Sequence, residues 1–266
     1  MGNVSERRKQ PPQVGVSVVI LALGPVPQSD VCAGAASSGM GSTLWMPLVK
    51  RVRQPFLGQW ALPGGGLRAD HSLEQSAYAA LESTTSLHPK YLEQLYTFGD
   101  PARSHGGLPM VSIVYWALVG EADGRIDFAG GDNVKWFPVN HLPELAFDHR
   151  TIVEYAMNRL RGKIESPDIA TRLVGERFTL SQLHDVYEAI AGQRIDLANF
   201  RRKMLASGLL EDTGEKLRIG RNRPAVYRYS RKPGTDLWTE AGTASESDDT
   251  RIAFQDDDAL SALMTA

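Results

Sequence analysis

A short segment in the last third of the chain combines an amide side chain with cations at the spacing of one helix face. Arg202 and Lys203 follow Asn199 by three and four residues, and Arg201 lies on the flank of the same face. Amide side chains make paired hydrogen bonds to adenine edges, and guanidinium groups make them to guanine edges. Arginine and lysine both also contact phosphates. The pattern therefore predicts a helix that contacts double-stranded DNA.

Two predicted helices must position this basic face. Thr179 is a good N-cap for the first helix, and Gln182 completes a capping box; both side chains are also candidates for contact with DNA. Asp196 can cap the second helix. The side chains expected to point inward are Leu183, Val186, Tyr187, Ile190, Leu197, Phe200 and Met204.

A β-hairpin is expected after the second helix, with strands at 215–219 and 225–229. The turn between them carries Arg221 and Arg223, which suit phosphates or a minor groove. Two helices followed by such a hairpin indicate a winged helix over 165–232. The alternative is a small protein-interaction domain with a basic surface.

The first half of the chain alternates strand patterns with one helix pattern. The expected strands lie at 14–22, 44–49, 111–119 and 134–138. Residues 72–84 fit an amphipathic helix, and three consecutive glycines, 64–66, form a turn just before it. These elements predict an α/β sandwich over 12–145, joined by a linking helix at 146–164 to the basic segment.

The stretch from Leu62 to Leu87 resembles the Nudix box, a loop-helix-loop motif of phosphohydrolases, without a gap in its frame. Residues 55–65 also match the approach to that box. The positions that carry Glu, Arg or the second Gly in the family have other residues here. These replacements are His71, Ala79, Ala80, Ser83, Thr84 and Ser86.

Three of these replacements remove the metal-binding chemistry of the motif. Positions 80, 83 and 84 share one helix face, where three carboxylates would gather a divalent cation. Ala80 offers no ligand, and the hydroxyls of Ser83 and Thr84 are neutral. Without a bound cation little remains to activate water, so we expect no metal site, no catalytic residue and no hydrolysis. The alternative is a residual pyrophosphohydrolase acting on ADP-ribose-like nucleoside diphosphate derivatives.

Both halves together resemble the Nudix-related transcriptional regulators of NAD metabolism, the NrtR family. The most specific matches are at 147–149, 178–180 and 199–203. The resemblance implies an α+β fold, with an N-terminal Nudix-like α/β/α sandwich followed by a C-terminal winged helix-turn-helix domain. It also implies a homodimer on a palindromic operator that represses genes of NAD synthesis or salvage and is released by ADP-ribose or a related metabolite.

Such a nucleotide effector needs cations for its phosphates and a flat side chain for its base. Cations precede the Gly-rich turn, and glycines there allow backbone amides to approach a phosphate. The candidates for contact with the effector are Lys50, Arg51, Arg53, Trp60, Gly65, Gly66 and Arg103. No separate cofactor is expected.

Charge is distributed unevenly along the chain, although the formal net charge is only -2. Between positions 150 and 232 there are 17 Lys and Arg against 10 Asp and Glu, whereas 233–266 holds 8 Asp and Glu and one Arg. The basic part favours a polyanionic partner. The acidic tail is expected to be disordered, and its role, like that of the Gly/Ser-rich insertion at 34–42, lies outside the resemblance.

The remaining composition limits the class of protein. A single cysteine, Cys32, excludes a disulfide framework and a cysteine-based zinc site. No apolar run reaches the roughly 18 residues of a membrane span, and the first residues lack a signal-peptide pattern. We therefore expect a cytoplasmic protein without membrane contact.

Overall fold

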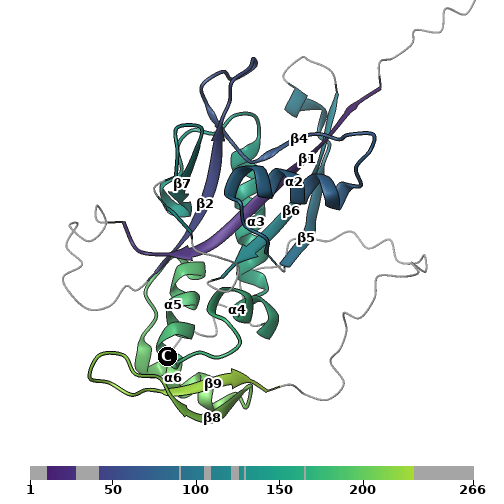
Figure 1. The fold of residues 1–266 in the computed structure, drawn as a ribbon. Helices are drawn as coiled ribbons and strands as arrows, with labels where there is room; N and C mark the ends of the chain where they lie inside the picture. Colours follow the sequence, from purple (N-terminus) through teal and green to yellow (C-terminus); the bar gives the residue numbers. More distant parts are fainter. Residues whose placement is uncertain are drawn as a thin grey trace, which may run out of the picture.

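The computed structural model describes residues 11–27, 42–89, 91–104, 109–120, 126–128, 130–164 and 166–230. The acidic tail at 233–266 and the insertion at 34–42, apart from Ser42, lie outside these residues. The fold is α+β, as the sequence predicts: a large sheet with helices is followed by three helices and a hairpin (Figure 1). Within the described ranges, no helix is long and apolar enough to cross a membrane.

One mixed sheet organises the first part of the chain. Its strands are β1 (Gln13–Gly24), β2 (Thr43–Lys50), β3 (Trp60–Ala61), β4 (Gly64–Gly66), β5 (Tyr91–Phe98), β6 (Met110–Val119) and β7 (Val134–Pro138). The order is β3-β2-β1-β6-β5, while β4 pairs with β1 and β7 pairs with β2. The central pair β1–β6 is parallel, and the pairs of β1 with β2 and of β5 with β6 are antiparallel. Buried on both faces, β1 reads as a nearly continuous apolar run.

The two faces of β1 belong to two different cores. Val18 and Ile20 pack with α2 (Leu73–Thr85) through Ala77 and Leu81. Val19 and Leu21 point the other way and join a core that includes α3 (His149–Gly162). This alternation follows from the period of two along a strand. The sheet is therefore covered by α2 on one face and α3 on the other.

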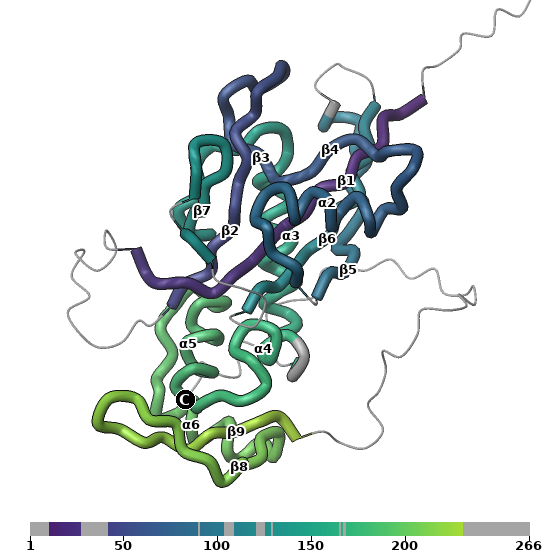
Figure 2. The backbone as a smooth tube through the Cα atoms, in the orientation of Figure 1, coloured from purple at the N-terminus to yellow at the C-terminus, as the bar shows by residue number. Residues whose placement is uncertain are grey.

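The last part of the chain forms a helical unit with a hairpin at one end of the sheet. Its elements are α4 (Pro167–Val174), α5 (Leu180–Ala191), α6 (Leu197–Ala206), β8 (Leu210–Lys216) and β9 (Ala225–Tyr229). The predicted capping box of α5 is present, because Thr179 and Gln182 exchange hydrogen bonds. Asp196 caps α6 by accepting from the Asn199 amide, as predicted. The hairpin lies at the opposite end of the molecule from α2 and β4 (Figure 2).

Several elements differ from the sequence prediction. Strand β3 was not predicted, and the glycines expected to form a turn at 64–66 are the short strand β4. The strand expected at 215–219 begins at Leu210 and ends at Lys216. Strand β5 was not predicted, because Glu93 and Gln94 interrupt its alternation and the register shifts between Gln94 and Tyr96. Helix α4 was also missed, although Ser166 followed by Pro167 is a helix-start signal.

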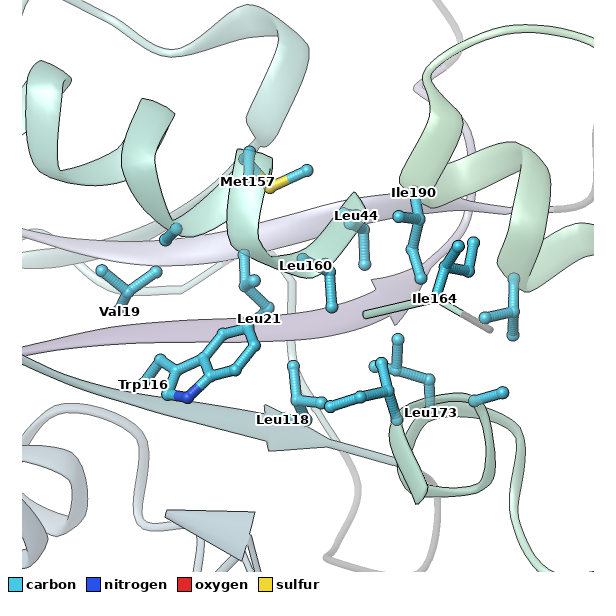
Figure 3. Close-up of a cluster of buried hydrophobic side chains, with 14 of the residues drawn as sticks. Val19, Leu21, Leu44, Trp116, Leu118, Met157, Leu160, Ile164, Leu173 and Ile190 are labelled. Carbon is cyan, nitrogen blue, oxygen red and sulfur yellow. The ribbon is translucent and has the colours of Figure 1, made fainter. Parts of the chain in front are cut away.

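One apolar core runs from the sheet into the C-terminal helices (Figure 3). Leu118 of β6, Leu44 of β2 and Leu160 of α3 belong to the same buried cluster as Leu173 of α4 and Ile190 of α5. These five side chains are at most 3% exposed. The DNA-binding unit expected from the sequence is therefore packed directly against the sheet, and the two share buried apolar surface.

Truncation of a side chain in this shared core should destabilise both parts together. Leu160→Ala removes a fully buried side chain and is expected to cost about 2–5 kcal/mol of unfolding free energy. Hydrogen exchange should show faster opening of amides in β6 and in α5 by the same factor. Leu205→Ala on α6, where the side chain is 53% exposed, is the control and should change little. Faster opening confined to one part would contradict the shared core.

Candidate functional site

Helix α2 carries the positions that the resemblance to the Nudix box aligns with metal ligands. Ser72 caps the helix in a capping box with Gln75, and Ser86 ends it in the left-handed conformation. Within the last turns, the Ser83 and Thr84 hydroxyls donate to the carbonyl oxygen of Ala80, at 3.0 and 2.7 Å. The two hydroxyl protons are thus used inside the helix. This face offers neutral oxygen atoms and no carboxylate from these three positions.

The Gly-rich turn before α2 forms the short strand β4 against β1. Gly64 is required there, because an added Cβ would lie 2.3 Å from the Val16 carbonyl oxygen. Gly65 and Gly66 are exposed, and a Cβ on either would meet open space. The two predicted glycines therefore present accessible backbone, whereas the packing constraint lies on their neighbour.

The end of α2 borders a hollow of about 200 Å³. Its walls include Thr84, Thr85 and Leu87 from α2 and the loop after it, with Asp127, Gly130 and Trp136 opposite. The residues of 126–134 were not among the predicted contacts. Their signal in the sequence is only a glycine pair, Gly130 and Gly131, ahead of β7.

The predicted cations Lys50, Arg51 and Arg53 lie where β2 ends. Lys50 pairs in register with Trp60 of β3 and is exposed, as is Arg53. Arg51 is partly buried, which lowers the pKa of its guanidinium. Its Nε donates to the Pro55 carbonyl oxygen at 2.8 Å, and its guanidinium carbon lies 4.5 Å from the centroid of the Phe147 ring. Of the predicted cations, Arg51 alone is tied into a turn.

Trp60 lies between these cations and the start of α3. Its ring meets Phe137 edge-on, with the centroids 5.1 Å apart, and it is half-buried. Its carbonyl oxygen accepts from the Ala146 amide at 2.8 Å. The residue therefore connects β3 to the segment that leads into α3, and its indole packs on β7.

Residues 147–149 attach the start of α3 to residues 51–62, which are called the cation-bearing loop below. The Leu62 amide donates to His149 Nδ1 at 2.9 Å, and both residues are buried. Phe147 adopts a φ of 56°, which is unusual for a bulky residue, and Phe56 packs edge-on against it. Sequence analysis identifies these three residues as a family match without assigning them a role. In the structure they join the cation-bearing loop to the long helix.

Arg103 differs from its prediction as an effector ligand. It is 8% exposed, and its guanidinium makes two hydrogen bonds of 2.9 Å to the Asp148 carboxylate and one of 2.7 Å to the Phe98 carbonyl oxygen. A bidentate pair with satisfied donors leaves no guanidinium free for a phosphate. Arg103, on the short 3-10 helix η1 (Pro101–Ser104), therefore positions Asp148 at the start of α3.

The basic face predicted on α6 is present at the surface. Arg201 and Arg202 are exposed, Asn199 and Lys203 are half-buried, and Phe200 is buried beneath them. Arg202 donates to the Asn199 side-chain oxygen at 2.8 Å, and Arg201 donates to the Ser181 hydroxyl at 2.9 Å. These bonds hold the two arginines in defined positions on the face.

One of the two DNA contacts predicted at the start of α5 is corrected. Thr179 is 1% exposed, and its hydroxyl accepts from the Gln182 amide. Gln182 is half-buried, and its side-chain oxygen accepts from the Thr179 amide at 2.8 Å. Both side chains serve the helix start; the burial of Thr179 excludes it as a DNA contact, whereas contact of Gln182 with DNA stays a prediction.

The wing has a tight cationic tip. Ile219 and Asn222 exchange two backbone hydrogen bonds of 3.0 Å around Gly220, whose φ is 59°, and Arg221. Such a two-residue turn favours glycine at its first position. Arg221 and Arg223 are exposed as predicted, and Arg218, which was not predicted, is exposed beside them.

Two other arginines near the wing are paired with carboxylates. Arg177 contacts Glu215 at 2.7 Å, and Arg228 contacts Glu211 at 2.9 Å. Their charges are partly balanced within the protein, and this sets them apart from the arginines of the tip and of α6.

A group of potential metal ligands in the described ranges has a structural use. His184, Asp185 and Glu188 of α5 have ligand atoms within 4.8 Å of one another. However, His184 Nε2 lies 2.8 Å from the Ile195 carbonyl oxygen, and Glu188 accepts from the Ile195 amide at 2.9 Å. The two side chains therefore fix the turn between α5 and α6.

Comparison with known families matches the two parts of the chain separately. The model of the NUDIX domain matches residues 39–156, and that of the NrtR DNA-binding winged helix domain matches residues 170–229. The first match covers the strands of the sheet from β2 to β7, with α2 and the first half of α3, and the second covers the end of α4, α5, α6 and the hairpin.

Three characterised proteins are similar to the chain. An ADPR responsive transcriptional repressor, NtrR, of Acinetobacter baylyi is 30% identical over 187 residues, which are 69% of this chain and 74% of the relative. An ADP-ribose pyrophosphatase of Methanocaldococcus jannaschii is 33% identical over 118 residues, or 43% of this chain and 67% of that protein. The crystal structure of Shewanella oneidensis NrtR complexed with a 27mer DNA has a TM-score of 0.62 at 33% identity, covering 82% of this chain and 93% of that one.

The buried His149 predicts a pH-dependent stability. Burial lowers its pKa from 6.5 to about 4, despite the opposing charge of Asp148. The unfolded chain therefore binds more protons than the folded one between pH 6.5 and about 4, so the unfolding free energy decreases as the pH is lowered through this window. At about 1.36 kcal/mol per pKa unit, the loss from this residue is roughly 3 kcal/mol.

Urea unfolding from about pH 7 to about pH 4.5 measures this effect. Other groups also titrate there, so the comparison is with His149→Gln, which cannot titrate and should show a flatter profile. Equal slopes for the two proteins would mean that this imidazole does not control acid stability.

Proposed function

Because the chain belongs to the NrtR family of Nudix-related transcriptional regulators, we propose that it is a ligand-responsive repressor of genes for NAD synthesis or salvage. It binds a palindromic operator in the cytoplasm as a homodimer and is released by ADP-ribose or a related NAD metabolite. We also propose four segments: a sensing domain at 12–145, a linking helix at 146–164, a winged helix at 165–232 and an acidic tail at 233–266.

The observation that carries the DNA-binding proposal is the arranged basic face of α6. Arg202 is exposed and already bonded to Asn199, so an amide and a guanidinium are offered together from one face. Paired hydrogen bonds from these groups are the common means of recognising purine edges in the major groove. The exposed arginines of the wing tip add phosphate contacts beyond this helix.

The effector site that we propose lies where β2 ends and the Gly-rich turn begins. Lys50, Arg51 and Arg53 supply cations, and exposed Gly65 and Gly66 supply accessible backbone. A diphosphate needs such donors, because each phosphate carries charge that arginine meets in a defined geometry. Trp60 beside them is the candidate surface for a base.

We propose that the protein does not hydrolyse this ligand. The similarity to an ADP-ribose pyrophosphatase favours the alternative of a residual hydrolase. Against it, Ser83 and Thr84 use their hydroxyls on the Ala80 carbonyl oxygen, and position 80 has no ligand atom in its side chain. Magnesium binds to oxygen ligands that usually include carboxylates, and α2 offers none at these positions.

The pure protein is therefore expected to give no turnover of ADP-ribose with magnesium or manganese. The measurement is release of AMP, followed chromatographically with each metal. The triple variant Ala80→Glu, Ser83→Glu and Thr84→Glu is the comparison, and it should gain metal affinity because it restores three carboxylates on one helix face. Metal-dependent AMP release by the unaltered protein would establish the hydrolase instead.

Removal of the α6 cations should weaken DNA binding. In Arg202→Ala with Lys203→Ala, affinity for a duplex should fall while ADP-ribose binding is kept. If Arg202 contacts guanine, its loss costs about 1–3 kcal/mol and relaxes specificity at one position. If it contacts only phosphate, binding weakens for all sequences and the salt slope shrinks by about one unit.

The matched control is Arg228→Ala, since this exposed arginine of β9 is paired with Glu211. Its removal should leave DNA affinity nearly unchanged. Titrations of a labelled duplex at several salt concentrations measure both variants. Unchanged affinity in the α6 double variant would show that another surface binds DNA.

A further inference from the structure

The guanidinium of Arg51 makes two contacts within the protein and could bind a phosphate instead of keeping one of them. It stacks on Phe147, and its Nε donates to the Pro55 carbonyl oxygen; its two terminal nitrogens have no acceptor among the described residues. The group is partly buried in this state. A partly desolvated cation with unused donors is a strong partner for an anion. A phosphate bound by those donors would draw the guanidinium away from its place over the Phe147 ring.

Phe147 depends on that position. Its φ of 56° lies in the left-handed region, which costs free energy for a bulky residue and persists only when neighbours hold it. The neighbours are the guanidinium of Arg51 on its ring, Phe56 at 4.8 Å and His149 at 5.5 Å between ring centroids. Two of the three belong to the cation-bearing loop, so movement of Arg51 reduces the restraint on Phe147.

The backbone beyond Phe147 is the first turn of α3. The Asp148 carboxylate binds Arg103 and does not cap the helix amides, so the contacts with the sensing domain help to position this turn. At the other end of α3, Arg161 Nε donates to the Ile190 carbonyl oxygen of α5 at 3.3 Å. Leu160 and Ile190 share the core between the two parts.

Helix α5 in turn determines where α6 lies. Tyr187 and His184 both pack edge-on against Phe200 of α6, with centroids 5.1 and 5.2 Å apart. His184 and Glu188 hold the backbone of Ile195 immediately before α6. Contacts therefore run without a break from Arg51 through α3 and α5 to the basic face.

We propose that Arg51 and Phe147 are the positioning residues that couple effector binding to DNA binding. A diphosphate effector withdraws Arg51 from Phe147, the first turn of α3 relaxes, and the displacement reaches α6 through α5. This inference rests on the proposed function. This coupling requires no contact of Arg51 or Phe147 with DNA. It also requires no contact of Phe147 with the effector.

The test is the factor by which saturating ADP-ribose changes affinity for a duplex that the protein selects from a random-sequence pool. Linkage requires the same factor for the effect of the duplex on ADP-ribose affinity, so both titrations are made. Allosteric couplings are typically about 5–150-fold, and we expect the unaltered protein in this range. Phe147→Leu keeps an apolar side chain but removes the ring on which Arg51 stacks. Movement of Arg51 then no longer affects the start of α3, so the factor should fall to within about twofold of unity.

Three comparisons separate coupling from damage to the fold. Phe147→Tyr keeps the ring and should keep the response. Arg53→Gln removes a neighbouring cation that does not touch Phe147; it should weaken ADP-ribose binding and leave the coupling factor unchanged. Phe147→Leu must still bind each ligand alone, which a merely unfolded variant would not do.

A coupling factor for Phe147→Leu equal to that of the unaltered protein overturns this inference and leaves the proposed repressor intact. A factor of one in the unaltered protein overturns the effector assignment and the inference together. Loss of response in Phe147→Tyr as well as in Phe147→Leu would also contradict it, because the ring face would then not be the feature that matters.

Discussion

The apolar face of α3 is the packing surface on which both parts of the molecule depend. Ile152, Ala156 and Leu160 are fully buried, and the cluster that contains them extends to the sheet on one side and to α4 and α5 on the other. Without this face the sheet would lose the cover of one side, and the C-terminal helices would lose the helix against which α5 packs. A single helix thus serves as core element and as connection, which is why no extended linker separates the two parts within the described residues.

Much of the fold follows from sequence pattern, and the failures have physical causes. The long apolar run of β1 and the capping box at Thr179 are strong local signals, and the structure matches both. Strand β5 gave a weak signal because its polar residues serve α3: Glu93 accepts from Arg159 and Lys163. Such a partner, about 70 positions away in sequence, leaves no local trace.

The candidate site was predicted better by residue type than by residue role. Arg51 and Arg202 were chosen as cations, and both lie where a charged ligand has access. Arg103 is predicted from its charge and Thr179 from its hydroxyl, yet each satisfies a neighbour within the protein, Asp148 in one case and the start of α5 in the other. A sequence gives the donors and acceptors of a side chain, whereas only the packing decides whether they remain available.

The Ser83 and Thr84 hydroxyls that donate to the Ala80 carbonyl oxygen have a consequence for the electrostatics at the end of α2. In a carboxylate-rich helix, the bound cation offsets repulsion between the acidic groups, so the state of the site varies with the supply of that cation. Here the three corresponding side chains are neutral, and the hydroxyls of Ser83 and Thr84 donate to the Ala80 carbonyl oxygen within the helix. The end of α2 therefore has no like charges at positions 80, 83 and 84 that a cation would have to offset, and two hydrogen bonds within the helix replace that demand.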